Sequence, residues 1–221
     1  MSPIVVASGI SHQFANGREL FKNLNCSLDA KLSALVGPNG VGKTCFGNIL
    51  AGALVPTEGV VRRNRSIKLF PQRQEPECVS VAEFLSDNEW SLLAANLLQN
   101  IDSRAICTTF SGGQWMRVRL ARELTCQFLI LDEPTNDLDR DGRDAVMRFL
   151  RNRAGGALLI SHDRECLRLC EDIFELSNRG LAEVQRWLVG VYGSEATGTR
   201  RSERGAGRRK ARARFCTCQT S

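Results

Sequence analysis

Residues 37–44 read Gly-Pro-Asn-Gly-Val-Gly-Lys-Thr, and this stretch decides the fold. It fits the pattern GxxxxGK[ST] and lies between an apolar run, Leu32–Val36, and a stretch of helical spacing, Lys43–Leu54. The motif requires this context of strand, loop and helix. Glycines let backbone amides approach a polyanion, and a helix N-terminus adds its positive dipole end. The sequence therefore predicts a loop that binds phosphates, made of Gly37, Pro38, Asn39, Gly40, Val41, Gly42, Lys43 and Thr44.

Two side chains at the end of this loop carry its chemistry. The Lys43 ammonium is expected to reach the β- and γ-phosphates of a nucleotide. The Thr44 hydroxyl offers an oxygen ligand to magnesium, a hard cation. The alternative is a glycine turn that matches by chance, and the fitting strand and helix on either side disfavour it.

A second apolar strand, Phe128–Leu131, ends in two acids, Asp132 and Glu133. Adjacent carboxylates at a buried position are costly unless a cation or a donor compensates them. A magnesium–triphosphate site supplies that compensation. We expect Asp132 to hold magnesium through water and Glu133 to polarise the attacking water. The alternative is an ordinary strand end that carries two surface acids.

The order of elements indicates an α/β fold. Apolar strands alternate with helical stretches, which favours a parallel sheet covered on both faces. The expected strands are Ile4–Ala7, Asn23–Leu28, Leu32–Val36, Val60–Arg62, Ile67–Phe70, Phe128–Leu131, Ala157–Ile160 and Ile173–Leu176. The expected helices are Lys43–Leu54, Val81–Leu85, Ser91–Leu98, Ser111–Leu124, Arg140–Arg151 and Asp163–Cys170.

Between the two motifs stands Ser111-Gly112-Gly113-Gln114, and with it the chain resembles the ATP-binding cassettes over about residues 4–190. The resemblance implies a P-loop NTPase fold with a mostly parallel core sheet, an antiparallel β subdomain and a small helical subdomain at about 73–125. The cassette would span 1–192. It also implies an ATPase that binds ATP and Mg²⁺.

The resemblance assigns further site residues. Gln72 lies in the family's Q-loop, 136–139 in its D-loop, and His162 at its switch histidine. Phe14 occupies the place of the aromatic that stacks on adenine. Gln72 would join Thr44 and Asp132 around magnesium, and His162 would sense the γ-phosphate. The alternatives are a plain strand-end amide, a histidine without a catalytic role, and a core or loop-anchoring phenylalanine.

The family's mechanism requires two cassettes, and this chain contains a single cassette. Two cassettes sandwich two ATP molecules, so that Ser111 and Gly113 of one contact the γ-phosphate held by the other. A helix N-terminus at a serine cap, with Gly112, Gly113 and Gln114, agrees physically with a second anion-binding end. The chain would form a homodimer, pair with another chain, or be a fragment. A frame change near residue 185 is one hypothesis for its tail.

One branch fits best. Residues 131–139, Leu-Asp-Glu-Pro-Thr-Asn-Asp-Leu-Asp, and 161–164, Ser-His-Asp-Arg, resemble the ABC-F proteins, which typically bind ribosomes. The competing hypothesis is the ATPase subunit of a transporter, with a membrane permease docking near residues 72–90. A degenerate, non-hydrolysing regulator is disfavoured by the intact Lys43, Asp132, Glu133 and His162.

Composition and charge set the remaining limits. Of the 221 residues 43% are hydrophobic, and no apolar run reaches the ~18 residues of a membrane span. With no signal peptide recognised at residues 1–6, we expect a cytoplasmic protein with reduced thiols at its nine cysteines and no metal cluster. The net charge of +6 lies entirely in a basic tail, 193–221, with eight basic and two acidic residues. This tail is either a contact to ribosomal RNA or a solvated disordered segment.

Overall fold

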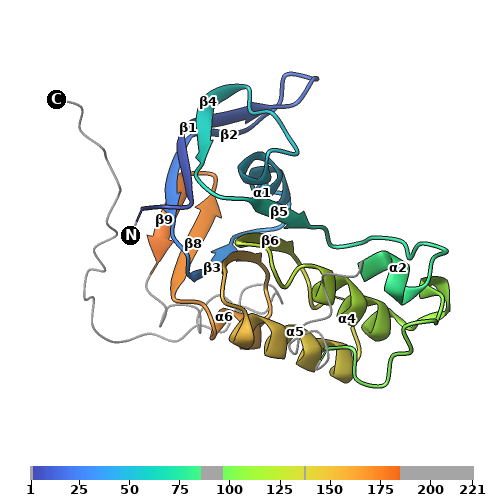
Figure 1. Ribbon diagram of the computed structural model, residues 1–221. Helices are drawn as coiled ribbons and strands as arrows, with labels where there is room; N and C mark the ends of the chain where they lie inside the picture. The colour runs from blue at the N-terminus through green and yellow to red at the C-terminus, as the bar shows by residue number, and fades with distance from the viewer. Residues whose placement is uncertain (1, 86–96, 137, 185–221) are drawn as a thin grey trace, which may run out of the picture.

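A computed structural model describes residues 2–85, 97–136 and 138–184 (Figure 1). Most of the expected helix at 91–98, Asp137 of the D-loop and the whole basic tail lie outside the described residues. The predictions for those segments therefore stay predictions.

The centre of the described structure is a six-stranded sheet in the order β5-β6-β7-β3-β8-β9. The first five strands are parallel, and β9 pairs antiparallel with β8. The strands are β3 (Leu32–Val36), β5 (Ile67–Phe70), β6 (Phe128–Asp132), β7 (Gly156–Ile160), β8 (Asp172–Ser177) and β9 (Gly180–Val184). Every residue of β6 and β7 is buried, which is why these strands read as apolar runs without alternation. The mostly parallel core is confirmed.

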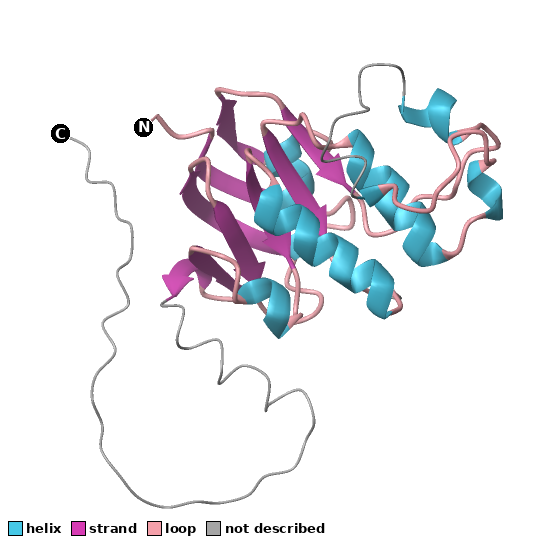
Figure 2. Cartoon of the chain, turned by 60° about the horizontal axis from the view of Figure 1, so that its bottom comes forward, coloured by secondary structure: helices cyan, strands magenta, loops and turns pink. Residues whose placement is uncertain are grey.

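Helices cover both faces of this sheet (Figure 2). On one face α1 (Lys43–Ala51) packs in a cluster that includes Ile130 of β6. On the other face α5 (Arg140–Asn152) and α6 (Arg164–Leu167) pack in a cluster that includes Leu129 and Leu131. Because successive strand residues point to opposite faces, β6 supplies both clusters from one short run.

An antiparallel sheet of three strands, in the described part of the chain, covers α1 from outside. It has the order β2-β1-β4, with β1 (Val5–Gln13), β2 (Glu19–Leu28) and β4 (Glu58–Arg63). A turn at Asn16-Gly17 joins β1 to β2, and Gly17 has a φ of 83° there. The antiparallel β subdomain is confirmed, with longer strands than expected.

A helical part lies beside the sheet (Figure 1). It contains α2 (Val81–Leu85), a 3-10 turn η1 (Cys107–Thr109) and α4 (Gly112–Arg122), which is capped by Ser111 as predicted. The Phe84 and Trp115 rings join α2 to α4 at 4.8 Å between centroids, and α4 also packs on α5. The boundary of this subdomain at 73–125 remains a prediction.

Further elements differ from expectation. The sequence did not predict β9, α1 ends at Ala51, short of the expected Leu54, and α6 ends at Leu167, short of the expected Cys170. Four residues after Leu167 the chain already pairs with β3, because the Glu171 N–H donates to the Leu32 carbonyl and Asp172 opposes Ser33. The early start of β8 therefore limits α6 to a single turn.

Two general expectations can be checked on the described residues. None of their helices combines the length and the apolar character that crossing a membrane requires. The seven cysteines among them are free thiols.

Candidate functional site

The phosphate loop connects β3 to α1 and turns at Gly37, Gly40 and Gly42, with φ angles of 149°, 78° and 106°. Gly37 passes so close to β8 that an added Cβ would lie 2.1 Å from the Leu176 carbonyl oxygen. Gly42 is the N-cap of α1, and no side chain caps the first turn of this described helix. The first amides of α1 are therefore available to an anion.

Lys43 is buried within the loop, with 8% of its surface exposed. Its ammonium donates to the Gly37 carbonyl at 2.8 Å and to the Pro38 carbonyl at 3.0 Å. Burial lowers the pKa of Lys43, whereas the carboxylates of Glu133 and Asp132 act to raise it. The structure thus brings the lysine of the first motif into the field of both acids of the second.

Asp132 ends β6 and is 7% exposed. Burial raises the pKa of its carboxyl above the ordinary 3.8, against the Thr44 side chain, which is hydrogen-bonded to it, and the charge of Lys43. Thr44 and Asp132 are thus in direct contact across two motifs that lie far apart in the sequence. Two oxygen donors of this kind suit Mg²⁺.

Glu133 follows Asp132 in a left-handed backbone conformation, with φ at 44°. Its N–H donates to the Ile160 carbonyl at 2.8 Å, so the residue is fixed to the end of β7. Burial raises the pKa of Glu133, and hydrogen bonds from the His162 backbone N–H and the Ser161 hydroxyl oppose this rise together with Lys43. A carboxylate with a raised pKa in a fixed position suits a general base.

His162 follows β7 and lies against this carboxylate, with 3.8 Å between its Nε2 and Oε1 of Glu133. About half of its side chain is exposed. Burial and the charge of Lys43 lower the pKa of His162 below 6.5, so the imidazole is neutral at pH 7. The structure therefore brings together Lys43, Thr44, Asp132, Glu133 and His162 at the carboxyl ends of β3, β6 and β7.

Gln72 and Phe14 lie at the edges of this group. Gln72 is exposed in the segment that follows β5. Phe14 is 39% exposed at the tip of the β1–β2 hairpin, and its ring stands edge-on to His12 with the centroids 5.9 Å apart. His12 in turn lies 6.2 Å from the Phe21 ring, which packs against Phe46 of α1. The roles of Gln72 and Phe14 stay predictions.

The predicted motif Ser111–Gln114 forms the start of α4. The Ser111 hydroxyl accepts from the Gln114 N–H at 3.3 Å, and the Gln114 side chain accepts from the Ser111 N–H at 3.0 Å. Gly113 lies so close to the cap of α5 that an added Cβ would meet the Asp139 carboxylate at 2.6 Å. The contacts described for this motif go to α5 and to its own helix, and none joins it to the phosphate loop.

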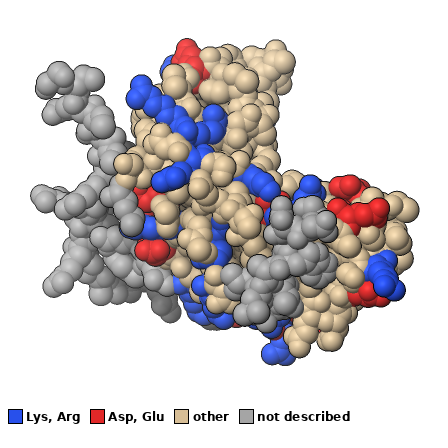
Figure 3. All heavy atoms as spheres, in the orientation of Figure 1, with Lys and Arg blue, Asp and Glu red and all other residues tan. Residues whose placement is uncertain are grey.

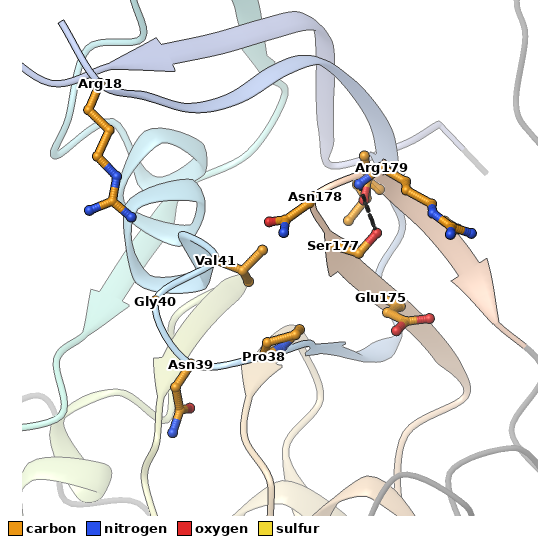
Figure 4. A pocket seen from close by; sticks show the side chains of 12 residues that line it. Arg18, Pro38, Asn39, Gly40, Val41, Glu175, Ser177, Asn178 and Arg179 are labelled. Atoms are coloured by element: carbon orange, nitrogen blue, oxygen red, sulfur yellow. Dashed lines mark hydrogen bonds between the residues drawn. The ribbon is translucent and has the colours of Figure 1, made fainter. Parts of the chain in front are cut away.

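A cavity of about 670 Å³ opens on the outer side of the phosphate loop (Figure 4). Its lining includes Arg18, the loop residues 38–41 and, from the hairpin of β8 and β9, Glu175 and residues 177–182. Figure 4 shows Val41 and Asn178 pointing into the space from opposite sides, with Arg18 beyond Val41. Lys43 and Asp132 do not line this described cavity, so it extends the loop surface away from the acids.

Sequence reasoning missed three contributors. Ser161 bonds Glu133, Arg18 lines the cavity, and the turn at 177–180 forms its far wall. A signal for the turn was present, because Asn178-Arg179-Gly180 lies between two stretches rich in apolar residues, 173–176 and 181–184, and would have indicated a hairpin. Nothing local to Ser161 or Arg18 indicates their contacts.

The residues fit a magnesium nucleotide. The uncapped amides of α1 and the Lys43 ammonium suit phosphate oxygens, and the Asp132 carboxylate beside Thr44 is buried, which makes its ionised form costly without a cation. A divalent cation would supply that charge.

Comparisons with known proteins agree with this geometry. The family model described as ABC transporter matches residues 21–136. ATP-binding cassette sub-family F member 3 of Pongo abelii is 30% identical over 201 residues, covering 83% of this chain and 28% of the relative. Protein GCN20 of Saccharomyces cerevisiae is 31% identical over 210 residues, covering 86% and 27%. The chain thus spans less than a third of the length of these relatives.

A solved structure of a metal-chelate type ABC transporter in an inward-facing conformation has the same fold. The TM-score is 0.67 at 21% sequence identity, and the match covers 84% of each chain.

Proposed function

The chain belongs to the ATP-binding cassette family, and on that premise we propose that it binds ATP with Mg²⁺ and hydrolyses it. The observation that carries the proposal is the meeting of the two motifs. The Thr44 side chain bonds Asp132, while the charge of Lys43 acts on both Asp132 and Glu133.

In the proposed mechanism the loop amides and Lys43 hold the β- and γ-phosphates. Thr44, Asp132 and Gln72 would hold Mg²⁺, which would supply positive charge beside the phosphates. Glu133, whose pKa is raised by burial, takes the proton of the attacking water. The neutral His162 orients Glu133 and contacts the γ-phosphate.

Efficient turnover then needs a second cassette, because Ser111–Gln114 have no contact to their own phosphate loop in the described structure. We propose that these residues serve the site of a partner, either a second copy or another cassette. The start of α4 fits this role, since Gly112 has open space around it.

The process that ATP hydrolysis drives is proposed from the resemblance of this chain to the ABC-F branch of the family. The resemblance at 131–139 and 161–164, together with relatives named for sub-family F, supports an ABC-F-like ATPase that acts on the ribosome. Service to a membrane permease is the competing function.

The substitution Glu133→Gln tests both proposals, ATP hydrolysis by this site and action on the ribosome. It is expected to keep ATP affinity, to lower turnover about 100-fold or more through loss of the base, and to trap a dimer that sediments with ribosomes. Glu19→Gln, at an exposed side chain of β2, is the matched control and should behave like the parent. Unchanged turnover would exclude Glu133 as the base, and association with membrane protein in place of ribosomes would favour the permease.

A further inference from the structure

The segment that carries Gln72 is anchored to α4 on both sides of that residue. The Arg119 guanidinium donates to the Pro71 carbonyl at 2.7 Å. The Trp115 indole N–H donates to the Gln74 carbonyl at 2.8 Å. Both donors come from α4, the helix capped by Ser111, and both bonds join residues more than 40 positions apart.

The anchoring residues form one row along the helix. Trp115, Arg119 and Glu123 are spaced by four, so they lie on one face of α4 and its C-cap. Glu123 pairs with Lys68 of β5, with 3.0 Å between the charged atoms. The helix therefore runs antiparallel to the strand and the segment after it, and it contacts them at Lys68, Pro71 and Gln74.

Arg119 is an unusual residue for its position. It is 4% exposed, and its neighbours Val118 and Leu120 are completely buried. Its guanidinium stacks on the Phe70 ring at 4.0 Å, and its Nε is buried without a described partner. Burial lowers the pKa of Arg119 to about 10, with Glu123 acting in the opposite direction.

A buried guanidinium with an unpaired N–H destabilises a fold relative to an apolar side chain of similar size. Stability therefore does not explain Arg119 at this position. What the charge provides is a directed bond to the carbonyl immediately before Gln72, with ring stacking that fixes its direction. Trp115, 7% exposed, provides a second directed bond two residues after Gln72.

We propose that Arg119 and Trp115 are positioning residues that hold Gln72 in place relative to the start of α4. This inference rests on the proposed function, in which Gln72 contacts Mg²⁺. Arg119 and Trp115 thereby determine how much Mg²⁺ increases the affinity for ATP. They leave the contacts that the phosphate loop makes to the nucleotide unaffected.

The test measures ATP affinity of the full chain twice, with EDTA and with Mg²⁺. Arg119→Met and Trp115→Phe should leave the affinity in EDTA within about twofold of the parent. Each should reduce the gain from Mg²⁺ about threefold to tenfold, the range expected for one lost hydrogen bond. Arg119→Lys, which retains a donor and the charge, should recover part of the gain.

A matched control and a double variant separate positioning from general damage. Arg122→Met removes a similar stacking contact, 4.6 Å above Phe84, from the same helix without touching the segment after β5. This variant should keep the full increase in ATP affinity that Mg²⁺ produces in the parent. If Arg119 acts through Gln72, the double variant Gln72→Ala with Arg119→Met should be no worse than Gln72→Ala alone.

Several results would overturn the inference. One is that a variant loses as much ATP affinity in EDTA as in Mg²⁺. Another is that Arg122→Met loses as much of the affinity gained with Mg²⁺ as Arg119→Met does. A third is that the losses of ATP affinity add up in the double variant. Trp115→Phe keeps the ring that packs on Phe84, so it provides the comparison if Arg119→Met fails to fold. A parent that binds no ATP in EDTA or Mg²⁺ would remove the proposed function and this inference together, whereas binding without the selective loss would remove this inference only.

Discussion

Replacing Lys43 with methionine separates nucleotide binding from fold stability. Lys43 is buried and donates to two loop carbonyls, of Gly37 and Pro38, at 2.8 and 3.0 Å. Methionine fills the same space with an unbranched chain but has neither a charge nor an N–H donor. The phosphates therefore lose their charged partner, while the loop keeps its packing.

The two effects differ in size. A hydrogen bond to a charged group contributes about 1.5–3 kcal/mol, which corresponds to about tenfold to 150-fold in ATP affinity. In the unliganded protein the substitution has two opposing effects on stability. Removal of the buried ammonium of Lys43 stabilises the fold, whereas the loss of its positive charge beside Asp132 and Glu133 destabilises it. We expect the free energy of unfolding to change by about 1 kcal/mol or less.

Titration with ATP in EDTA measures the first effect, and urea unfolding without nucleotide measures the second. Lys22→Met is the control, since Lys22 is an exposed lysine on β2 with only a 4.0 Å contact to Glu19. It should change neither quantity. An ATP affinity of Lys43→Met within twofold of the parent would refute the assignment of the loop.

Two further predictions concern stability. Burial raises the pKa of Asp132 above its ordinary 3.8, so the folded protein binds this proton more tightly than the unfolded chain and its ionised carboxylate lowers stability at neutral pH. Asp132→Asn should thus raise Tm at pH 7 and lose that gain as the pH falls toward 3.8; thermal unfolding across pH would contradict this if the gain were constant. Gly37→Ala should destabilise by about 2 kcal/mol or more, because φ at 149° and the Leu176 carbonyl both exclude a Cβ. Gly112→Ala, with open space around it, is the comparison in urea unfolding, and equal losses for both would refute the steric argument.

Much of the fold follows from local patterns. The spans Leu32–Val36, Ile67–Phe70 and Val81–Leu85 were predicted with the bounds that the structure has. Apolar runs indicate buried strands because a sheet covered on both faces removes the need for alternation. The strand β9 escaped prediction since its residues are half-buried at a sheet edge, where neither alternation nor a continuous apolar run is required.

The candidate site likewise has parts that the sequence predicts and parts that only the structure shows. Gly37–Thr44 and Asp132–Glu133 were identified from the sequence, because backbone geometry and residue chemistry within a few positions carry these motifs. The bonds of Ser161 and His162 to Glu133 depend on β6 and β7 being neighbours in the sheet. A strand order of this kind is not encoded in any short stretch.

The sequence by itself thus determined that this chain is an ATP-binding cassette with one phosphate loop and one pair of acids, since each is a local pattern. Tertiary structure alone decided how these motifs are arranged relative to each other. It placed Thr44 against Asp132, set His162 3.8 Å from Glu133, and anchored the segment around Gln72 to α4 through Arg119 and Trp115. These contacts join residues dozens of positions apart, and only the packing of helices on the finished sheet brings such residues within bonding distance.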